Sequence, residues 1–205
     1  EEVEVFLDKT PFYGESGGQV GDTGEMSSDG FRASVTDTKK VIEGLHSHII
    51  KIKEGKLRVW DRVTCRVDTR RRKAIMSNHT ATHLLQASLQ NIIGEHVKQA
   101  GSLVAPDRLR FDFTHFFPIS RDEIRSIEDT VNHKVLENIN VETSVMDIKD
   151  AVASGATALF GEKYGETVRV VKVPGVSSEL CGGTHCRATG DIGPFVIVSE
   201  GSVAS

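Results

Sequence analysis

The pattern of apolar residues changes abruptly near Asp68, and this change constrains the fold more than any other feature of the sequence. Before Asp68, short runs of alternating or β-branched residues are separated by Gly, Ser and Asp, as is typical of strands joined by turns; these runs read VEVFLD, FRASVTDT, LHSHIIKI and RVTCRVD. Their spacing favours a small barrel or a sandwich. After Asp68, apolar residues recur at helical spacing. We therefore predict two domains, a β-barrel-like domain over residues 1–68 and an α+β domain over residues 69–205.

The second part of the chain alternates helices with strands. Apolar residues at helical spacing predict a helix from Asp68 to Ile93, because Gly94 then offers a C-terminal stop. Ser120 and Glu123 form the signature of a capping box in front of a second apolar stripe, which predicts another helix. The remaining elements are a short helix at residues 147–154 and strands at HVKQAGSLVA, RLRFDFTH, VETSVM, TVRVVKV and, after a glycine-rich loop, GPFVIVS. This order lacks βαβ regularity and indicates an antiparallel sheet with helices on one face.

The composition excludes several classes of protein. Of the 205 residues, 38% are hydrophobic and 26% are charged, which is ordinary for a globular protein. We see no apolar run of about 18 residues and no basic-then-apolar leader, so we expect neither a membrane span nor a secretory signal. Three cysteines are too few for a disulfide scaffold, which favours a reducing, cytoplasmic location. The net charge of −4 argues against a protein that coats nucleic acid, although a local basic path stays open.

Four side chains of the kinds that bind metals are arranged in two pairs. His79 and His83 lie four residues apart on the predicted helix and therefore project from one of its faces. Cys181 and His185 are also four apart, and the glycine pair between them permits a tight turn. Nitrogen and sulfur donors of this kind suit Zn²⁺ better than Mg²⁺ or Ca²⁺. The joint pattern predicts a zinc site, whereas the first pair alone would be equally well explained as two half-buried, locally hydrogen-bonded histidines.

Other zinc and nucleotide sites do not match the sequence. A zincin protease needs H-E-x-x-H, and Thr80 occupies the place of the Glu. A nucleobase deaminase needs H-x-E and P-C-x-x-C, and neither is present. The stretch ESGGQVGDTG lacks the G-K-[ST] of a phosphate-binding loop. The predicted zinc site therefore belongs to a different class.

Four longer stretches resemble the editing domain of alanyl-tRNA synthetases: TPFYGESGGQVGDTG, HTATHLL, GSLVAPDRLRFDFTH and CGGTH. Together they run from Thr10 to the end of the chain. Free-standing editing proteins of the same family are the closest alternative. The editing domain of threonyl-tRNA synthetases has a comparable histidine pair, but its later motif resembles C-x-G-P-H, whereas this chain has Gly183-Thr184 before His185. Because the chain starts without Met and stops straight after a strand-like run, we expect it to be an excised part of a synthetase.

The resemblance implies an activity, a cofactor and partners. Members of this family hydrolyse the ester that joins serine or glycine to the tRNA for alanine. Their fold is a small β-barrel followed by a sheet-and-helix domain. The resemblance therefore implies Zn²⁺ as the cofactor. It also implies two kinds of partner, the mischarged tRNA and the ATP-binding aminoacylation and C-terminal domains of the same chain.

The resemblance also implies the residues of the site. The zinc ligands that it implies are His79, His83, Cys181 and His185. The substrate-binding residues that it implies are Thr82, Gln99, Ser102 and the loop residues Gly17, Gly18 and Gln19. We expect Cys181 and Gln99 to take part in catalysis, Cys181 as a metal ligand rather than as a nucleophile.

The chemistry of the expected site leaves one question open. Four protein ligands close a zinc site, whereas a catalytic zinc usually keeps one position for water. We expect the metal to hold the ester and to polarise its carbonyl. No carboxylate in the motifs is an obvious general base. A zinc-stabilised RNA-binding module without catalysis is the competing interpretation.

The basic run TRRRK lies at the expected start of the helix that carries the histidines. Cations at this end oppose the helix dipole, at a cost of about 0.3 kcal/mol or more each. A phosphate of the tRNA would compensate this cost, and a solvated charged cap is the alternative. The tRNA-binding residues expected on this ground are Arg70, Arg71, Arg72 and Lys73. Beside His185, we expect Cys186 to be a spectator thiol that could compete for the metal.

Overall fold

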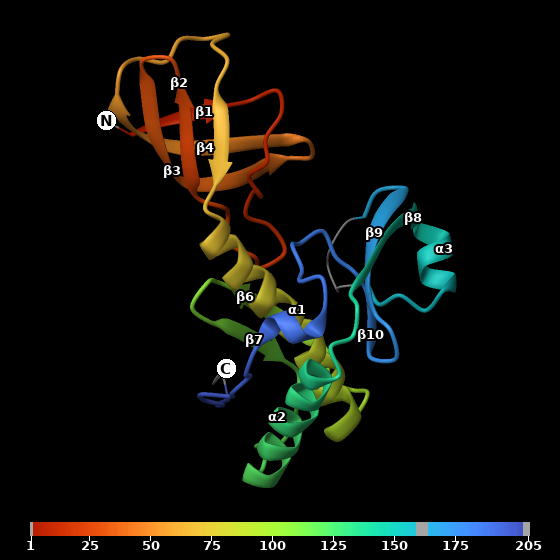
Figure 1. The fold of residues 1–205 in the computed structure, drawn as a ribbon. Coiled ribbons are helices and arrows are strands. Elements are labelled where there is room, and N and C mark those ends of the chain that lie inside the picture. Colours follow the sequence, from red (N-terminus) through yellow and green to blue (C-terminus); the bar gives the residue numbers. More distant parts are fainter. Residues whose placement is uncertain (1, 159–163, 203–205) are drawn as a thin grey trace.

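A computed structural model describes residues 2–158 and 164–202 of the chain. The N-terminal sheet lies at one end of the long helix α1 (Thr69–Ile92) (Figure 1). The second long helix and the other sheets lie beside the rest of α1, and the short helix α3 (Ile148–Ala153) lies apart from it. Over the described residues, the structure combines antiparallel sheets with three α-helices, which confirms the predicted α+β class. In the described part of the chain, no helix combines the length and the apolar character needed to cross a lipid bilayer.

The N-terminal sheet has five antiparallel strands in the order β1-β4-β3-β2-β5. Along β3, buried and exposed side chains alternate, so one face of the sheet packs on a core of its own. That core contains Phe12, Met26, Phe31, Val35 and Ile50. The strands are β1 (Glu2–Phe6), β2 (Gly24–Ser28), β3 (Phe31–Ile42), β4 (Leu45–Glu54) and β5 (Thr64–Val67). Strand β2 could not be predicted, because GEMSS is poor in β-branched and aromatic residues.

The prediction of a barrel is wrong in one respect, because the sheet is not closed. Among the described strands, β1 pairs with β4 and β5 pairs with β2, which leaves both as edges. These edge strands have only five and four residues, and register shifts along β3 bend the sheet between them. An alternating sequence gives a strand one inner and one outer face in an open sheet and in a barrel alike. Closure could therefore not be read from the alternation.

Helix α1 (Thr69–Ile92) starts directly where the N-terminal sheet ends, as the sequence predicts. Its N-cap is Asp68, whose carboxylate accepts hydrogen bonds from the backbone N–H groups of Arg70 and Arg71. A carboxylate at this end of the helix interacts favourably with the dipole and offsets the unfavourable basic run. The cap thus explains locally how four cations are tolerated at a helix start.

Helix α2 (Arg121–Leu136) packs against α1 and closes the main core. The predicted capping box is present, because the Ser120 and Glu123 side chains each accept from the backbone N–H of the other residue. The apolar stripe of α2 faces α1 and is buried, whereas its opposite face is polar. The core between the two helices includes Leu84, Leu85, Leu89, Val97, Ile127, Val131 and Val135.

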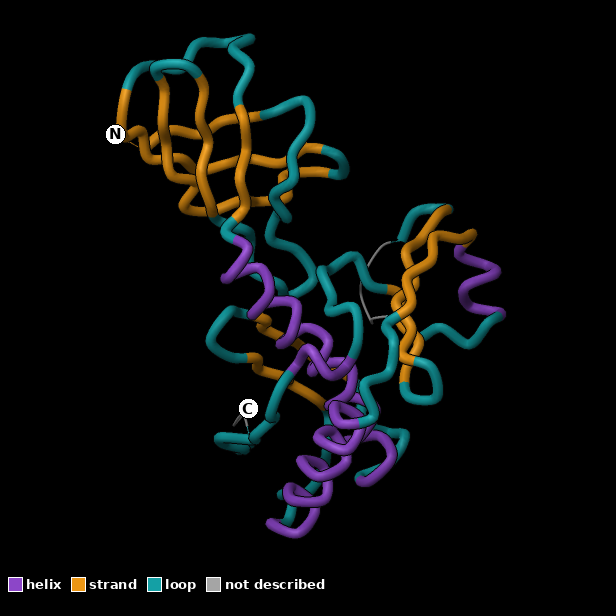
Figure 2. The backbone as a smooth tube through the Cα atoms, viewed as in Figure 1, coloured by secondary structure: helices purple, strands orange, loops and turns teal. Residues whose placement is uncertain are grey.

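Two separate sheets take the place of the single sheet expected after residue 68 (Figure 2). The first is a two-stranded ribbon of β6 (Gln99–Val104) and β7 (Leu109–Phe113), which contacts α1. The second has the order β10-β9-β8 and carries α3 on β8 and β9. Its elements are β8 (Glu142–Asp147), α3 (Ile148–Ala153), β9 (Thr167–Val173) and β10 (Ser177–Leu180), and a short 3₁₀ helix, η1 (Thr189–Ile192), follows.

The prediction of a final strand at GPFVIVS is wrong. Residues 193–199 run along α2 without strand pairing, and their backbone groups bond to side chains of that helix. The Asn132 side chain donates to the Phe195 carbonyl (2.8 Å) and accepts from the Phe195 N–H (2.9 Å). The Glu128 carboxylate accepts from the Ile197 N–H (2.6 Å). Because these backbone groups have hydrogen-bond partners in α2, the apolar run needs no partner strand.

A buried ion pair fixes the loop between β1 and β2 to the first turns of α1. Asp22 is 1% exposed and accepts hydrogen bonds from the Arg72 guanidinium and from the backbone N–H of Tyr13. The Arg72 guanidinium also donates to the Pro11 carbonyl (2.9 Å), and that of Arg71 donates to the Gly21 carbonyl (2.7 Å). Two of the four cations in the basic run therefore hold the loop between β1 and β2 against the start of α1.

We expect Asp22→Ala to lower the free energy of unfolding by about 3 kcal/mol, because it leaves a guanidinium and an N–H without their buried acceptor. The matched control is Asp107→Ala. Asp107 pairs with Arg108 at 2.7 Å, but both side chains are 65% exposed, so we expect its loss to cost less than about 1 kcal/mol. Urea unfolding of both variants provides the measurement. Equal losses would show that the Asp22–Arg72 pair does not fix the loop.

Candidate metal centre and its cavity

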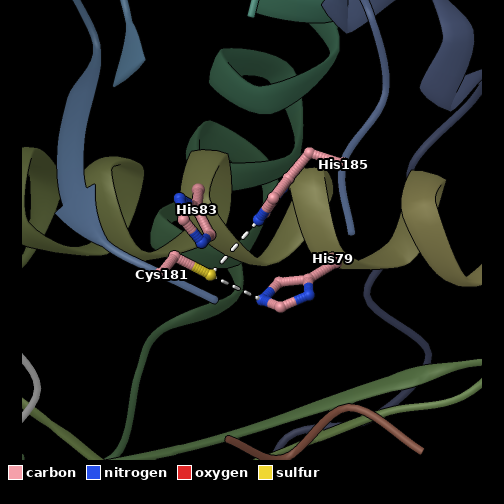
Figure 3. A group of neighbouring side chains, drawn as sticks. All are labelled: His79, His83, Cys181 and His185. Carbon is pink, nitrogen blue, oxygen red and sulfur yellow. Dashed lines mark hydrogen bonds between the residues drawn. The ribbon is translucent and has the colours of Figure 1, made fainter. Parts of the chain in front are cut away.

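The four side chains predicted as metal ligands meet at one point (Figure 3). His79 and His83 come from adjacent turns of α1, and Cys181 and His185 come from the loop after β10. The Cys181 Sγ lies 3.4 Å from His79 Nε2 and 3.3 Å from His185 Nε2. One donor atom of each residue lies within 4.8 Å of the other three. Residues about a hundred positions apart thus form a compact group of three nitrogens and one sulfur.

The loop that supplies Cys181 and His185 is held tightly against α1. Arg169, on β9, donates to the Cys181 carbonyl (2.8 Å) and to the Gly183 carbonyl (2.6 Å). Gly183 then passes directly over the His79 ring, where an added Cβ would lie 2.0 Å from the ring atom Cε1. The neighbouring Gly182 has open space, with no described atom within 4 Å of such a Cβ. The two glycines of the motif therefore have different structural roles.

Oxygen atoms surround the imidazoles on the side away from Cys181. The Nδ1 of His79 lies 2.7 Å from Gln19 Oε1, and the Nδ1 of His185 lies 3.2 Å from Thr80 Oγ1. For His83, Nδ1 lies 3.5 Å from a Glu179 oxygen, which is too long for a hydrogen bond, so this buried nitrogen lacks a partner among the described residues. Histidines that bind metals usually have such an oxygen on the ring nitrogen that faces away from the metal.

Burial keeps all three imidazoles neutral. Burial, with the Arg169 charge as a smaller cause, lowers the pKa of His79 to about 4. Burial, with the His79 and Arg169 charges as smaller causes, lowers the pKa of His83 to about 3. Burial also lowers the pKa of His185 well below its usual value. Neutral imidazole nitrogens and a thiolate are the donors that Zn²⁺ prefers. The four residues thus fit a zinc ion in donor type, number and spacing.

Beside the cluster lies a buried carboxyl group, that of Glu179, which was not predicted from the sequence. It lies on β10, is 6% exposed, and burial raises its pKa to about 8. It also lines the cavity in front of the cluster. Its position two residues before Cys181 was the available signal, but a single Glu in SSEL looks like an ordinary solvent-facing residue of a strand.

These shifts predict a stability optimum for the metal-free chain near pH 6.5. The imidazoles take up protons more readily in the unfolded chain, so stability falls as the pH drops below about 6.5. Glu179 behaves in the opposite way: the folded chain keeps its proton up to about pH 8, so stability falls as the pH rises from about 4.5 to 8. At about pH 8, where free imidazoles have lost nearly all their protons, only the Glu179 effect remains.

Urea unfolding of the metal-free chain at about pH 5, 6.5 and 8 checks this prediction. We expect Glu179→Gln to abolish the alkaline loss and to leave the acid loss intact, because the amide does not titrate. An alkaline loss that persists unchanged in Glu179→Gln would contradict the assignment.

A cavity of about 880 Å³ opens in front of the cluster. His79, His83 and Cys181 form part of its wall, and Thr82, Gln99, Ser102 and Gly17 form another part. The Gln99 amide donates to Ser102 Oγ (3.2 Å), and the Thr82 hydroxyl donates to the Asn78 carbonyl (2.8 Å), which leaves the Thr82 oxygen lone pairs as acceptors. The structure therefore brings three small polar side chains to the same cavity as the cluster.

The other two residues of the glycine-rich loop lie behind this wall. Gly18 packs on β6, where an added Cβ would lie 2.3 Å from Ser102 Oγ. Gln19 is completely buried, and its amide bonds to His79 and to Thr184. The substrate-binding roles expected for the pocket and loop residues stay predictions.

The basic run divides into two pairs. Arg71 and Arg72 are engaged with the loop before β2, as described above, whereas Arg70 and Lys73 are exposed. Their expected contact with tRNA stays a prediction. The thiol of Cys186 lies 3.7 Å from Ser77 Oγ, away from the four-residue cluster, and burial raises its pKa.

Two family models match parts of the chain. The model of class II tRNA synthetases (A) matches residues 1–71, which cover the N-terminal sheet and the start of α1. The model of the second additional domain of threonyl and alanyl tRNA synthetases matches residues 168–205, which include the loop with Cys181 and His185.

Curated relatives match the chain along its whole length. The alanine–tRNA ligase of Myxococcus xanthus is 56% identical over 99% of the chain, and that of Acetivibrio thermocellus is 56% identical over 100%. That of Xanthomonas axonopodis pv. citri is 55% identical over 100% of the chain. The chain spans 23% of the length of each of these relatives. Along its whole length, the chain is therefore similar to one region of alanine–tRNA ligases.

Proposed function

We propose that the chain is an editing domain that hydrolyses the ester of serine or glycine wrongly attached to the tRNA for alanine. One observation carries the proposal: three of the four predicted zinc ligands and three small polar side chains line a single cavity. A volume of about 880 Å³ lies in the range of small-molecule sites and suits an aminoacylated terminal nucleotide. Under this proposal the function is proofreading rather than aminoacylation.

The need for a second site follows from the energetics of recognition. An alanine-activating pocket cannot exclude glycine or serine well, because one methyl or hydroxyl group changes binding by only about 1–3 kcal/mol. A site that binds the serine hydroxyl can discriminate more strongly, because alanine would leave its buried polar groups without partners. Thr82, Gln99 and Ser102 offer hydroxyl and amide groups for this purpose.

In the proposed mechanism, the chain holds the metal and orients the ester. His79, His83, Cys181 and His185 hold Zn²⁺, which when bound supplies Lewis-acid polarisation of the ester carbonyl. The imidazoles are neutral at pH 7, so they bind without first losing protons. Gln99 and Ser102, hydrogen-bonded to each other, orient the aminoacyl group from another part of the cavity wall.

The proposed partners are the mischarged tRNA and other regions of an alanine–tRNA ligase. Relatives that are about four times longer than the matched region support this, since the chain spans 23% of their length. The exposed Arg70 and Lys73 are the proposed phosphate contacts. A cytoplasmic location, with ATP used by the aminoacylation region, is part of the same proposal.

A second candidate function is a zinc-stabilised RNA-binding module without catalysis. The observation in its favour is that four protein ligands would fill the coordination sphere of zinc. Deacylation assays separate the two. Under the editing proposal, the zinc-loaded chain hydrolyses seryl- and glycyl-tRNA for alanine and leaves alanyl-tRNA intact. Hydrolysis of none of the three would favour the non-catalytic module.

We expect Thr82→Val to lower the rate on seryl-tRNA by about tenfold relative to glycyl-tRNA, because the cavity loses an acceptor for the serine hydroxyl, which glycine lacks. The matched control is Thr130→Val on α2. The Thr130 hydroxyl makes the same kind of bond to a carbonyl one turn earlier (2.7 Å), but outside the cavity. If Thr82→Val and Thr130→Val hydrolyse the two substrates in the same ratio of rates, Thr82 does not take part in substrate recognition.

A further inference from the structure

Gln19 comes from the loop between β1 and β2, yet its side chain ends beside the metal centre. It is completely buried. Its Oε1 lies 2.7 Å from His79 Nδ1 and accepts a hydrogen bond from the backbone N–H of Thr184 (2.9 Å). Its Nε2 donates to the Thr184 hydroxyl (2.9 Å). One side chain therefore links the N-terminal sheet region to both segments that supply the cluster.

The hydrogen-bond network determines which way round the Gln19 amide lies. A backbone N–H can only donate, so the amide atom that faces Thr184 N must be the carbonyl oxygen. The same oxygen faces His79 Nδ1 and can only accept. His79 Nδ1 must then carry the proton, which leaves the lone pair on Nε2, the nitrogen 3.4 Å from the Cys181 sulfur. Gln19 thus selects the tautomer that a metal ligand needs.

The loop that carries Gln19 is locked in place. Gly17 and Gly18 have φ angles of 56° and 80°, a conformation that other residues rarely adopt. The turn closes through paired backbone hydrogen bonds between Ser16 and Gln19 (3.0 and 3.2 Å). Val104 on β6 bonds to both sides of Gln19, with its N–H donating to Gly18 (2.8 Å) and its carbonyl accepting from Val20 (3.1 Å). Gln19 is therefore presented to His79 by a rigid backbone.

We propose that Gln19 is a positioning residue of the metal centre: it fixes the tautomer and ring orientation of His79 and anchors the Cys181–His185 loop through Thr184. This assigns Gln19 a role other than the substrate contact implied by the family resemblance. It also makes the N-terminal sheet region part of the metal centre. The inference rests on the proposed zinc site but concerns only hydrogen bonds within the chain.

The first test measures the His79 tautomer directly in the metal-free chain. Burial keeps the imidazole neutral at pH 7, so its two ring nitrogens give distinct ¹⁵N chemical shifts according to which one carries the proton. In the unaltered chain we expect Nδ1 to be protonated. Gln19→Ala removes the acceptor and should give a mixture of tautomers. Gln19→Glu keeps an oxygen in the same place and should restore the Nδ1-protonated form.

The second test measures zinc affinity by competition with a chelator. We expect Gln19→Ala to weaken zinc binding by about 10–100-fold, the usual effect of losing such an outer partner, and Gln19→Glu to recover most of the loss. The matched control is Gln90→Ala on α1. The Gln90 amide makes one bond to the Val97 carbonyl (3.1 Å), outside the four-residue cluster, so zinc affinity should not change.

The possible outcomes separate this inference from the proposed function. If the unaltered chain binds zinc and Gln19→Ala keeps both its affinity and the His79 tautomer, the positioning role is wrong and the zinc site stands. If the unaltered chain binds no zinc, the proposed function and this inference both fail. Should Gln19→Ala not fold, Gln19→Glu decides, because a positioning role requires Nδ1 protonation and near-normal zinc affinity in that variant.

Discussion

Gly183→Ala is expected to weaken zinc binding by about 100-fold or more and to abolish deacylation, whereas Gly182→Ala should leave both nearly unchanged. A Cβ at position 183 would lie 2.0 Å from Cε1 and 2.4 Å from Nδ1 of His79, and 2.9 Å from Gln19 Oε1. Relieving these contacts requires either the loop or the His79 ring to move. Both movements disturb the meeting of His79 with Cys181.

Gly182 provides a matched control in the adjacent position. Gly182→Ala makes the same substitution in the same motif, and the φ angle of Gly182 also lies outside the left-handed region. At Gly182, however, an added Cβ would lie in open space. Zinc titration and deacylation of seryl-tRNA by the two variants provide the measurement, and circular dichroism shows whether each is folded. Comparable defects in both would mean that the motif needs backbone freedom at each glycine rather than a close approach at one.

Cys181→Ala is expected to lose zinc and deacylation together. Cys181 supplies the only sulfur in the cluster, and its Sγ lies within 3.4 Å of two of the three imidazoles. Removing it leaves three nitrogen donors and a gap in the coordination shell, which should cost at least about 100-fold in zinc affinity. The control is Cys186→Ala, because the Cys186 thiol lies beside Ser77 instead of in the cluster.

The same variant distinguishes a ligand from a nucleophile. If Cys181 acts only by holding the metal, activity should follow zinc occupancy and recover in part when the metal is in large excess. A nucleophile would leave Cys181→Ala inactive even when it is fully loaded with zinc. Full activity of Cys181→Ala without zinc would remove the metal from the mechanism.

Local signals predicted the helices well, because each of their ends is set by nearby residues. Asp68 is the N-cap of α1, and Ser120 and Glu123 form the capping box at the start of α2. These contacts join residues at most three positions apart. Closure of the N-terminal sheet depends instead on which edges pair, which alternation does not encode. The segment around Phe195 looked like a strand because its backbone partners, the side chains of Asn132 and Glu128, are more than sixty residues away.

The meeting of His79, His83, Cys181 and His185 could be predicted because their residue types and spacing are specific. The surrounding groups could not, because each is an ordinary residue that acquires its role through long-range contact. Gln19 bonds to Thr184, which lies 165 positions later in the sequence. Arg169 lies in a valine-rich strand, where nothing in the sequence distinguishes it from a surface residue. Likewise, Glu179 acquires its raised pKa only when β10 packs it against α1.

X-ray absorption at the zinc edge of the purified, zinc-loaded chain tests whether His79, His83, Cys181 and His185 bind one zinc ion. We expect one zinc ion per chain, with a single sulfur at about 2.3 Å and three imidazole nitrogens at about 2.0 Å. A first coordination shell without sulfur, or with fewer than two imidazoles, would contradict this expectation.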